Sequence, residues 1–198
     1  VEVVGMPEGL AADAERIRRI AEDHRVGSVR VAQDDEERAL LWKGRKSAFG
    51  AIARIQPNYY LHDTVVPRSK LPEVLTKVYE IADRHGLQVL NVFHAGDGNL
   101  HPLLVFDARV PGTAERVHRA GEEIVHASVE AGGVLSGEHG IGLEKRDYMT
   151  MMFSAIDLEA QETLRRAFDP DGIANPGKVL PSPATCGDIH SVPEGAWI

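Results

Sequence analysis

Hydrophobic residues recur along the chain with two spacings, one typical of helices and one typical of strands. Apolar positions three or four residues apart predict helices at residues 10–24, 34–49, 68–85, 113–131 and 157–167. Apolar and β-branched runs predict strands at residues 1–4, 26–31, 59–66, 87–94, 100–106 and 132–135. Helices interleaved with an antiparallel sheet favour an α+β fold, a ferredoxin-like antiparallel sheet with helices packed on it and a helical C-terminal addition.

The two central strands are joined by a segment rich in histidine and glycine, residues 94–101 (His-Ala-Gly-Asp-Gly-Asn-Leu-His). Its Asp-Gly pair is a strong signal for a two-residue hairpin turn. Such a turn would place His94 directly opposite His101 on one sheet face, with Cβ atoms about 4.5–5.5 Å apart. Pro102 would then face Phe93 and has no N–H to donate, so the second strand is expected to be an edge or to contain a local break.

Two facing imidazoles can share one divalent cation, whereas a single histidine is more often a surface or core residue. A third candidate ligand lies in the glycine-rich segment 132–142, where Glu138 and His139 are adjacent. His94, His101 and Glu138 would make a set of two imidazoles and one carboxylate, which leaves coordination positions open for a substrate. We expect His139 to point away from Glu138 and to be free to act as a base.

Length and composition narrow the class of protein. The 198 residues, 43% of them hydrophobic, fit one domain, which we place at residues 1–181, followed by a Pro- and Gly-punctuated tail at residues 182–198. The chain begins at Val1 rather than Met, so we expect a piece of a longer protein. The chain has no charged segment followed by an apolar run at its start and no run of about 18 apolar residues, so we expect neither a signal peptide nor a membrane span.

Charge and cysteine content exclude further classes. A net charge of −8 argues against a nucleic-acid ligand, because phosphate backbones are met by basic surfaces. The single cysteine, Cys186, excludes an internal disulfide and a cysteine-based metal site, and it fits a reducing cytoplasm. The chain also lacks both common phosphate-binding loops, G-x-G-x-x-G after a strand and G-x-x-x-x-G-K-[ST]. We therefore expect that it cannot bind a dinucleotide cofactor by itself.

Three motifs, in this order and spacing, resemble the C-terminal domain of FAD-linked oxidases of the vanillyl-alcohol-oxidase type. They are residues 94–101, 136–142 (Ser-Gly-Glu-His-Gly-Ile-Gly) and 168–178 (Phe-Asp-Pro-Asp-Gly-Ile-Ala-Asn-Pro-Gly-Lys). Within the family the match is closest to the flavoprotein subunit of glycolate oxidases, with D-lactate and D-2-hydroxyglutarate dehydrogenases as more distant relatives. The resemblance covers residues 1–181 and implies that a FAD-binding domain, absent from this chain, precedes it in the same polypeptide.

The resemblance implies roles for single residues. His94, His101 and Glu138 match the family's metal ligands, for which zinc or manganese is expected, and His139 matches its catalytic base. Arg45 lies in a Trp-x-x-Arg stretch and would clamp the substrate carboxylate, with an exposed basic cluster as the alternative reading.

Four more positions bear on substrate and flavin binding. The Asn99 amide, next to the metal pair, would orient substrate, and the resemblance implies that Asn175 and Lys178 face the flavin. Leu61 aligns with the place where relatives acting on larger diacids carry a lysine, which favours a small monocarboxylate such as glycolate or lactate. Expected partners are the 2-hydroxy-acid substrate, the flavin-binding domain, other oxidase subunits including an iron–sulfur protein, and a second copy in a homodimer.

We interpret the chain as the substrate-binding domain of a flavin-dependent 2-hydroxy-acid dehydrogenase or oxidase, which converts glycolate or D-lactate to the 2-oxo acid. We expect the fragment alone to be inactive, and the enzyme to be cytoplasmic or peripheral at the inner membrane through partner subunits. One alternative is a metal-dependent hydrolase, in which the same ligands activate water and His139 or Glu144 is the base. The other is a non-enzymatic, metal-stabilised interaction module, in which the metal would be fully enclosed.

Overall fold

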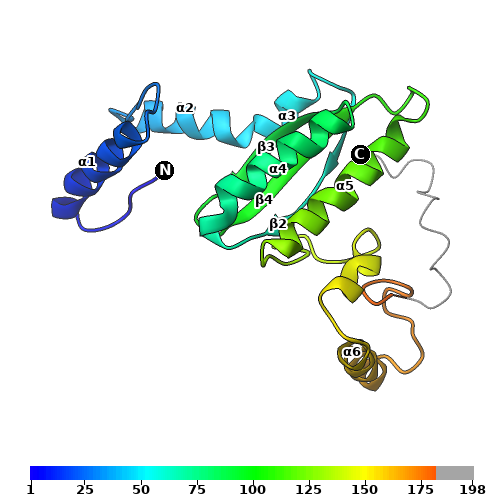
Figure 1. The fold of residues 1–198 in the computed structure, drawn as a ribbon. Helices are drawn as coiled ribbons and strands as arrows, with labels where there is room; N and C mark the ends of the chain where they lie inside the picture. The colour runs from blue at the N-terminus through cyan, green and yellow to red at the C-terminus, as the bar shows by residue number, and fades with distance from the viewer. Residues whose placement is uncertain (182–198) are drawn as a thin grey trace. The chain divides into compact units, whose positions relative to one another are not determined.

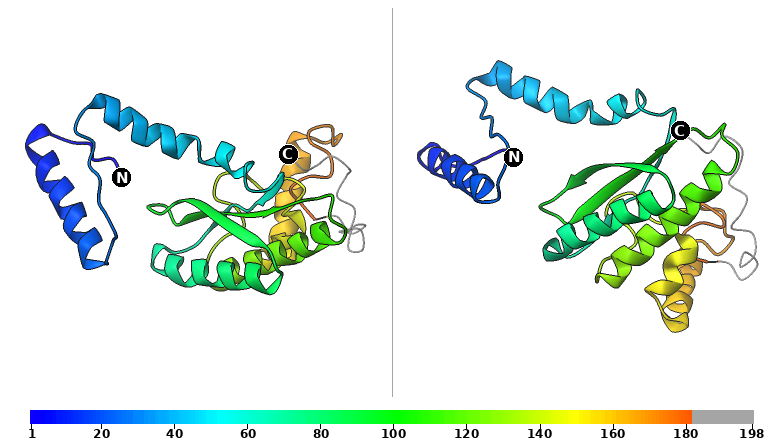
Figure 2. Two further views of the ribbon diagram at one scale, coloured as in Figure 1. Left: turned by 90° about the horizontal axis from the view of Figure 1, so that it is seen from above. Right: turned by 45° about the horizontal axis from the view of Figure 1, so that its top comes forward.

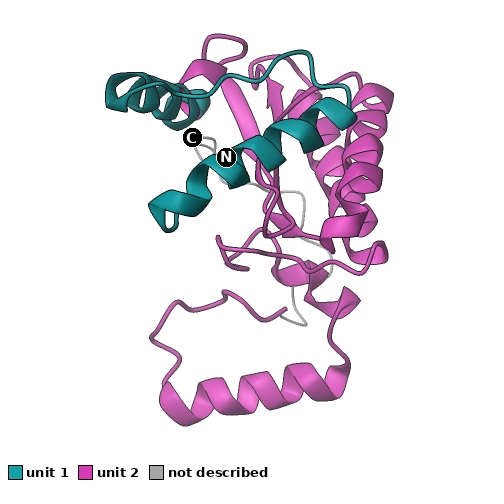
Figure 3. Ribbon diagram, turned by 90° about the vertical axis from the view of Figure 1, so that its left-hand side faces the viewer, with its two compact units in different colours: residues 1–48 teal, residues 49–198 magenta. Residues whose placement is uncertain are grey.

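A computed structural model describes residues 1–181, and the chain divides into two units, residues 1–48 and 49–198 (Figure 3). The first unit contains α1 (Pro7–Asp23) and α2 (Asp35–Lys46), and neither helix has a buried residue. The side chain of Asp34 caps α2 by accepting a hydrogen bond from the Glu37 N–H at 2.8 Å. The predicted strands at residues 1–4 and 26–31 do not form, because these short runs have no partner strand within the described residues.

The second unit contains the sheet and the helices that cover it (Figure 1). Its elements are, in order, α3 (Ala48–Ile52), β1 (Asn58–Leu61), β2 (Thr64–Val65), the 3-10 turn η1 (Arg68–Lys70), α4 (Leu71–Arg84), β3 (Gln88–His94), β4 (Asn99–Phe106), α5 (Thr113–Glu130), η2 (Arg146–Met151) and α6 (Ala155–Phe168). The helices and the central hairpin therefore lie where the hydrophobic pattern predicts them.

β4 is the central strand of the sheet, not an edge. It pairs antiparallel with β3 on one side and with β1 and β2 on the other. β1 and β2 pair with β4 in the same register, as two parts of one strand. Only residues 62–63, next to Pro102 of β4, separate them. The His62 N–H donates to the Pro102 carbonyl at 2.9 Å, but proline has no N–H to return the bond. β4 itself therefore runs unbroken through Pro102, and the gap lies in its partner strand, so both the expected edge and the expected break in the second strand are wrong.

The order of elements confirms the α+β, ferredoxin-like prediction. The chain order is a first strand made of β1 and β2, then α4, β3, β4 and α5. The last strand is reduced to a single bridge, in which Val134 pairs with Val65. This is a β-α-β-β-α-β sequence with β4 and the first strand at the centre of the sheet. α6 is the helical C-terminal addition, and Ser154 and Asp157 form a capping box at its start.

The hairpin between β3 and β4 has a longer turn than its Asp-Gly pair predicts. Four residues, 95–98, form the turn, so that His94 pairs with Asn99 and His101 pairs with Val92. The predicted two-residue turn and the direct pairing of His94 with His101 are therefore wrong. Gly98 explains the difference, because its carbonyl accepts a hydrogen bond from the Val66 N–H at 2.9 Å and the turn is held there. The register moves by two residues, so every side chain keeps its sheet face.

The two faces of the sheet differ in what covers them. α4 and α5 lie together over one face (Figure 2), where alternate residues of β4 are buried in the main core. The core residues of β4 on this face are Leu100, Leu104 and Phe106. The intervening residues Leu103 and Val105 pack with Ile52 of α3. Asn99 and His101 alternate with the main-core residues and therefore belong to the face away from α4 and α5.

The loop after α6 is joined to the glycine-rich loop that follows α5. The Val179 N–H donates to the Gly142 carbonyl at 2.8 Å, and the Arg146 guanidinium donates to the Gly177 carbonyl at 2.6 Å. The second and third sequence motifs are therefore neighbours in the fold. The predicted tail at residues 182–198, including Cys186, lies outside the described residues. Within residues 1–181, no helix is long and apolar enough to cross a membrane.

Candidate metal and substrate site

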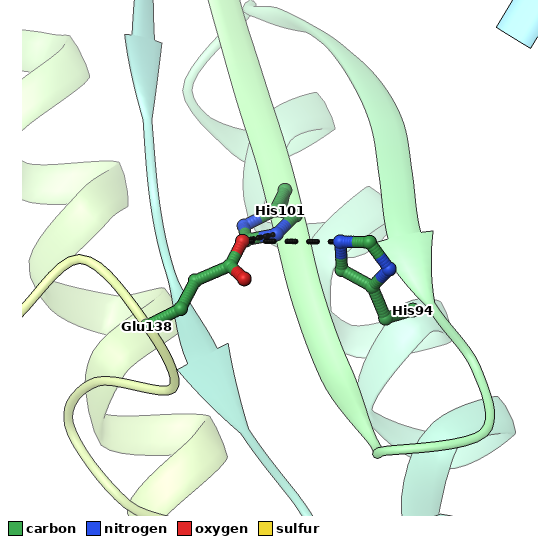
Figure 4. Close-up of side chains that lie close together, drawn as sticks. All are labelled: His94, His101 and Glu138. Carbon is green, nitrogen blue, oxygen red and sulfur yellow. Dashed lines mark ion pairs between the residues drawn. The ribbon is translucent and has the colours of Figure 1, made fainter. Parts of the chain in front are cut away.

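Two histidines of the central hairpin and one glutamate from a distant loop come together on the face away from α4 and α5 (Figure 4). His94 ends β3, His101 lies on β4, and Glu138 follows α5. Oε1 of Glu138 is 2.8 Å from Nε2 of His101 and 3.8 Å from Nε2 of His94. The ligand atoms of the three side chains all lie within 4.8 Å of one another. One cation could therefore contact all three.

Burial of the three side chains is uneven. The His101 side chain is 4% exposed, whereas those of His94 and Glu138 are 45% and 50% exposed. Nδ1 of His101 is buried and has no hydrogen-bond partner among the described residues. Two imidazoles and a carboxylate are the donor set of open zinc, manganese and iron sites, so these residues fit a divalent metal. The exposed side of the group leaves room for a further ligand.

His139 lies against this group instead of pointing away from it. Its ring stacks on His101 with centroids 5.2 Å apart and an angle of 11° between the planes. Its Nε2 is 3.8 Å from Oε1 of Glu138. The expectation that His139 turns away from Glu138 is therefore wrong. The stacking holds the imidazole beside the ligand set, where it can reach a molecule bound there.

Asn99 is buried at the edge of the same group, paired with His94 across the hairpin. Its Oδ1 is buried without a hydrogen-bond partner in the described part of the chain. A Cβ atom on Gly137 would lie 2.7 Å from Nδ2 of Asn99, so only glycine lets the loop come this close. The position suits the predicted contact with substrate, which stays a prediction.

Asp63, which the resemblance in sequence suggests only as a supporting residue of the site, is a functional candidate in the structure. The carboxylate is 1% exposed and accepts hydrogen bonds from the Ser136 hydroxyl and from the backbone N–H groups of residues 137–139. Burial alone would raise its pKa, but these hydrogen bonds and the charge of Lys145 outweigh burial and hold the pKa of Asp63 well below its usual range. The sequence signal for such a role is a charged residue inside the predicted strand 59–66, whose neighbours two positions away, Leu61 and Val65, are apolar.

Lys145 is a residue beside the site that sequence reasoning misses. Its Nζ donates to the carbonyl oxygens of Asp63 and Leu135, the latter at 2.7 Å, and lies 3.9 Å from the Asp63 carboxylate. Burial lowers the pKa of Lys145, while the charges of Asp63 and Glu144 oppose that shift. The ammonium thus joins the broken strand to the loop after α5.

Of the other predicted residues, Asn175 and Lys178 are not part of the His–Glu group, and Arg45 belongs to the first unit. Arg45 lies on α2 of the first unit with an exposed side chain. Asn175 and Lys178 lie in the loop after α6, where the Lys178 Nζ donates to Oδ1 of Asn175 at 3.4 Å. Arg165 donates to the backbone carbonyls of both residues. Substrate binding by Arg45 and flavin binding by Asn175 and Lys178 stay predictions.

Several known proteins are similar to this chain over most of its length. The glycolate oxidase subunit GlcD of Escherichia coli (strain K12) is 43% identical over 191 residues, which cover 96% of this chain and 38% of that protein. GlcD of Bacillus subtilis (strain 168) is 38% identical over 180 residues, 91% of this chain and 38% of that protein. The mitochondrial D-lactate dehydrogenase [cytochrome] of Arabidopsis thaliana is 29% identical over 187 residues, 93% of this chain and 33% of that protein.

The chain thus spans less than two fifths of the length of these relatives. A model of the family described as FAD linked oxidases, C-terminal domain, matches residues 1–179. That range contains all three motifs and all the residues of the His–Glu group, and it agrees with the resemblance stated from the motifs alone. The chain belongs to the C-terminal domain family of the FAD-linked oxidases.

Proposed function

We propose that this chain is the substrate-binding part of a flavin-dependent 2-hydroxy-acid oxidoreductase that converts glycolate or D-lactate to the 2-oxo acid. The observation that carries the proposal is the convergence of His94, His101 and Glu138 on a half-open sheet face, with His139 stacked beside them. The names of the similar proteins, glycolate oxidase and D-lactate dehydrogenase, support the substrate class.

The residues of the group divide into two roles. His94, His101 and Glu138 would hold a divalent cation, zinc or manganese, which when bound polarises the hydroxyl and carboxylate oxygens of a hydroxy acid and lowers the pKa of the hydroxyl. His139 is not needed as a ligand, and its ring is within reach of a molecule bound at the exposed side of the group. We assign to His139 the acceptance of the hydroxyl proton as general base.

The remaining roles concern orientation and electron transfer. Asn99 would donate its amide to the bound acid, and Arg45 would grip the substrate carboxylate with two parallel hydrogen bonds. A flavin supplies the hydride acceptor, and we assign its binding to the part of the polypeptide that this chain does not contain, with Asn175 and Lys178 facing it. Other oxidase subunits, including an iron–sulfur protein, would then accept the electrons, and they could hold a cytoplasmic enzyme at the inner membrane.

The two alternatives are less well supported. A metal enclosed only for stability would require buried ligands on all sides, but the side chains of His94 and Glu138 are about half exposed. A hydrolase would use the same open group, but its class disagrees with the oxidase family to which the chain belongs.

Two substitutions at neighbouring positions test the proposal in the complete polypeptide. Glu138→Gln weakens a charged ligand, so bound metal and substrate affinity should both fall. His139→Asn leaves the ligands in place, so metal should stay while kcat falls by ~10²–10⁴, as expected for a positioned acid–base group. Metal content by mass spectrometry and kcat with glycolate and D-lactate are measured for both variants.

Matched substitutions on α5 serve as controls. Glu130 and His126 are exposed there and make no contact with the group, so Glu130→Gln and His126→Asn should change neither metal content nor kcat. The roles would be reversed if His139→Asn lost the metal while Glu138→Gln kept it. Unchanged turnover in both variants would refute the proposed site.

A further inference from the structure

We propose that Asp63 is the positioning residue of this site, because its carboxylate holds the loop that presents Glu138 and His139 to His101. The inference rests on the proposed function, since that loop supplies the metal ligand and the base. The Asp63 carboxylate makes no hydrogen bond to the Glu138 carboxylate or to the His139 ring. It acts on them through the backbone of residues 136–139.

The contacts of Asp63 cover the loop residue by residue. Oδ2 accepts hydrogen bonds from the Ser136 hydroxyl at 2.7 Å and from the N–H groups of Gly137, Glu138 and His139 at 3.0, 3.1 and 2.9 Å. Oδ1 accepts a second bond from the Gly137 N–H at 3.1 Å. Three consecutive N–H groups that point at one anion fix the backbone of the loop and therefore the directions in which its side chains leave.

The loop needs this anchor because it has little regular structure of its own. Only the bridge between Val134 and Val65 precedes it, and residues 135–144 contain no helix or strand. Ser136 extends the anchor, because its hydroxyl also accepts a hydrogen bond from the Gly140 N–H at 2.7 Å. Asp63 and Ser136 together therefore satisfy the N–H groups of four loop residues, 137–140, two of which are the proposed ligand and base.

Lys145 makes the anchor rigid from the other side. Its ammonium donates to the carbonyls of Asp63 and Leu135. It therefore links the segment between β1 and β2 to the start of the loop that carries Glu138 and His139. It also places a positive charge 3.9 Å from the buried carboxylate. A carboxylate that is buried, paired and fully hydrogen-bonded has one well-defined position, as a support for metal ligands requires.

The closing experiment measures zinc and manganese binding to this chain by calorimetry. Asp63→Asn keeps the size of the side chain but removes its charge and replaces one acceptor with a donor. We expect the dissociation constant to rise roughly 10–100-fold, the range seen for residues that support metal ligands. Ser136→Ala removes one donor and keeps the carboxylate, so it should give a smaller rise and serves if Asp63→Asn does not fold.

Two controls separate positioning from a general loss of stability. Val78→Ala opens a cavity in the core under α4, in a cluster that includes no residue of the loop 135–144, and should lower stability without changing metal affinity. Asp107→Asn makes the same substitution at the other end of β4, where the carboxylate pairs with Arg109, and should change nothing at the site. A rise in the dissociation constant in Val78→Ala equal to that in Asp63→Asn would overturn the proposal.

A double-variant cycle tests the route of action. If Asp63 acts through the placement of Glu138, then Asp63→Asn should cost little further metal affinity in the Glu138→Gln background. Additive losses in the double variant would overturn the proposal, and so would an unchanged dissociation constant in Asp63→Asn alone.

Amide hydrogen exchange provides a readout that needs no metal. The N–H groups of residues 137–139 should be protected in the native chain and lose that protection in Asp63→Asn, but not in Asp107→Asn. A native chain that binds neither zinc nor manganese would refute the proposed metal site, and the exchange result would still decide the role of Asp63. Unprotected amides at residues 137–139 in the native chain would overturn the positioning role.

Discussion

His62 is a buried imidazole on the helix-covered face of the sheet, next to the catalytic candidates but pointing away from them. Its ring meets Tyr60 edge-on with centroids 4.5 Å apart. Its Nε2 has no hydrogen-bond partner within the described part of the chain, and it lies against Gly121 of α5. Burial, followed by the charges of Lys145 and His118, lowers the pKa of His62 to about 3. The residue is therefore neutral in the folded protein across the physiological range.

This pKa predicts acid sensitivity of the fold. Below about pH 6.5 the unfolded chain binds a proton at His62 that the folded chain does not accept until about pH 3. The free energy of unfolding should therefore fall as the pH drops through this window, by up to about 1.4 kcal/mol per pH unit from this residue. His62→Phe keeps a ring in place and should flatten the slope in urea unfolding measured across the window.

An exposed histidine provides the comparison for that measurement. His24 follows α1 and is exposed, so His24→Phe should leave the slope as it is in the native chain. Equal slopes in His62→Phe and the native chain would show that His62 takes up its proton in the folded state as readily as in the unfolded chain.

Gly137 allows the loop of Glu138 to lie against the sheet. A Cβ atom there would lie 2.6 Å from Cγ2 of Val65 and 2.7 Å from Nδ2 of Asn99. Gly137→Ala should therefore lower the free energy of unfolding by about 1–3 kcal/mol and weaken metal binding, because the loop must move outward. Gly50→Ala is the control, since a Cβ at Gly50 would meet no atom within 4 Å. Urea unfolding and zinc titration of both variants check this, and equal stability of the two would contradict it.

The turn between β3 and β4 offers a test at the level of one element, because its two glycines have different roles. Gly98 has φ +74°, and a Cβ there would collide with the Val66 carbonyl, whereas a Cβ at Gly96 would meet nothing within 4 Å. Gly98→Ala should destabilise the protein by about 1–3 kcal/mol. Gly96→Ala should have no cost and could gain up to about 1 kcal/mol by restricting the unfolded chain.

Urea unfolding of the two turn variants measures this difference directly. A two-residue turn would free Gly98 from the Val66 carbonyl and make the two substitutions nearly equivalent. Their comparison therefore also tests the observed register, in which His94 pairs with Asn99.

The helices could be predicted from the sequence because each carries its own local pattern. The segments 68–85 and 113–131 agree with η1 plus α4 and with α5 to within one residue at each end. The apolar runs 1–4 and 26–31 look like strands, but pairing depends on a partner that local sequence does not show. The hairpin turn fails for the same reason, because the Val66 backbone that holds Gly98 lies in another part of the chain.

The residues of the site also divide into those that a local sequence pattern predicts and those that depend on a distant part of the chain. Its metal ligands could be predicted although the turn was wrong. The register differs from the predicted one by two residues, and such a shift leaves His94 and His101 on the same face of the sheet. Asp63 is suggested in sequence only as a supporting residue and Lys145 not at all, because their roles depend on backbone groups of a loop more than seventy residues from Asp63. A carboxylate that binds backbone N–H groups leaves no spacing pattern between side chains.

At the scale of the whole molecule, the hydrophobic core belongs to one unit. Every buried cluster in the described chain consists of residues from Phe49 onward, whereas α1 and α2 have no buried residue. All three proposed metal ligands, the proposed base and Asp63 also lie in the second unit, and Arg45 alone of the proposed substrate contacts lies in the first. Stability and metal binding should therefore be separable from carboxylate binding by Arg45.

Deletion of residues 1–48 tests this separation. The remaining chain keeps all of the core clusters, so its melting temperature and its zinc affinity should match those of the intact chain. Affinity of the zinc-loaded protein for D-lactate or glycolate should fall roughly tenfold or more, because a charged bidentate hydrogen bond is lost.

Arg45→Lys in the intact chain should reproduce most of that fall, since an ammonium cannot bind both carboxylate oxygens in parallel. Arg54→Lys, an exposed arginine of the second unit, should not. If the shortened chain unfolds or loses zinc, the first unit contributes to the fold of the second; if it binds the hydroxy acids as well as the intact chain does, Arg45 is not the carboxylate clamp.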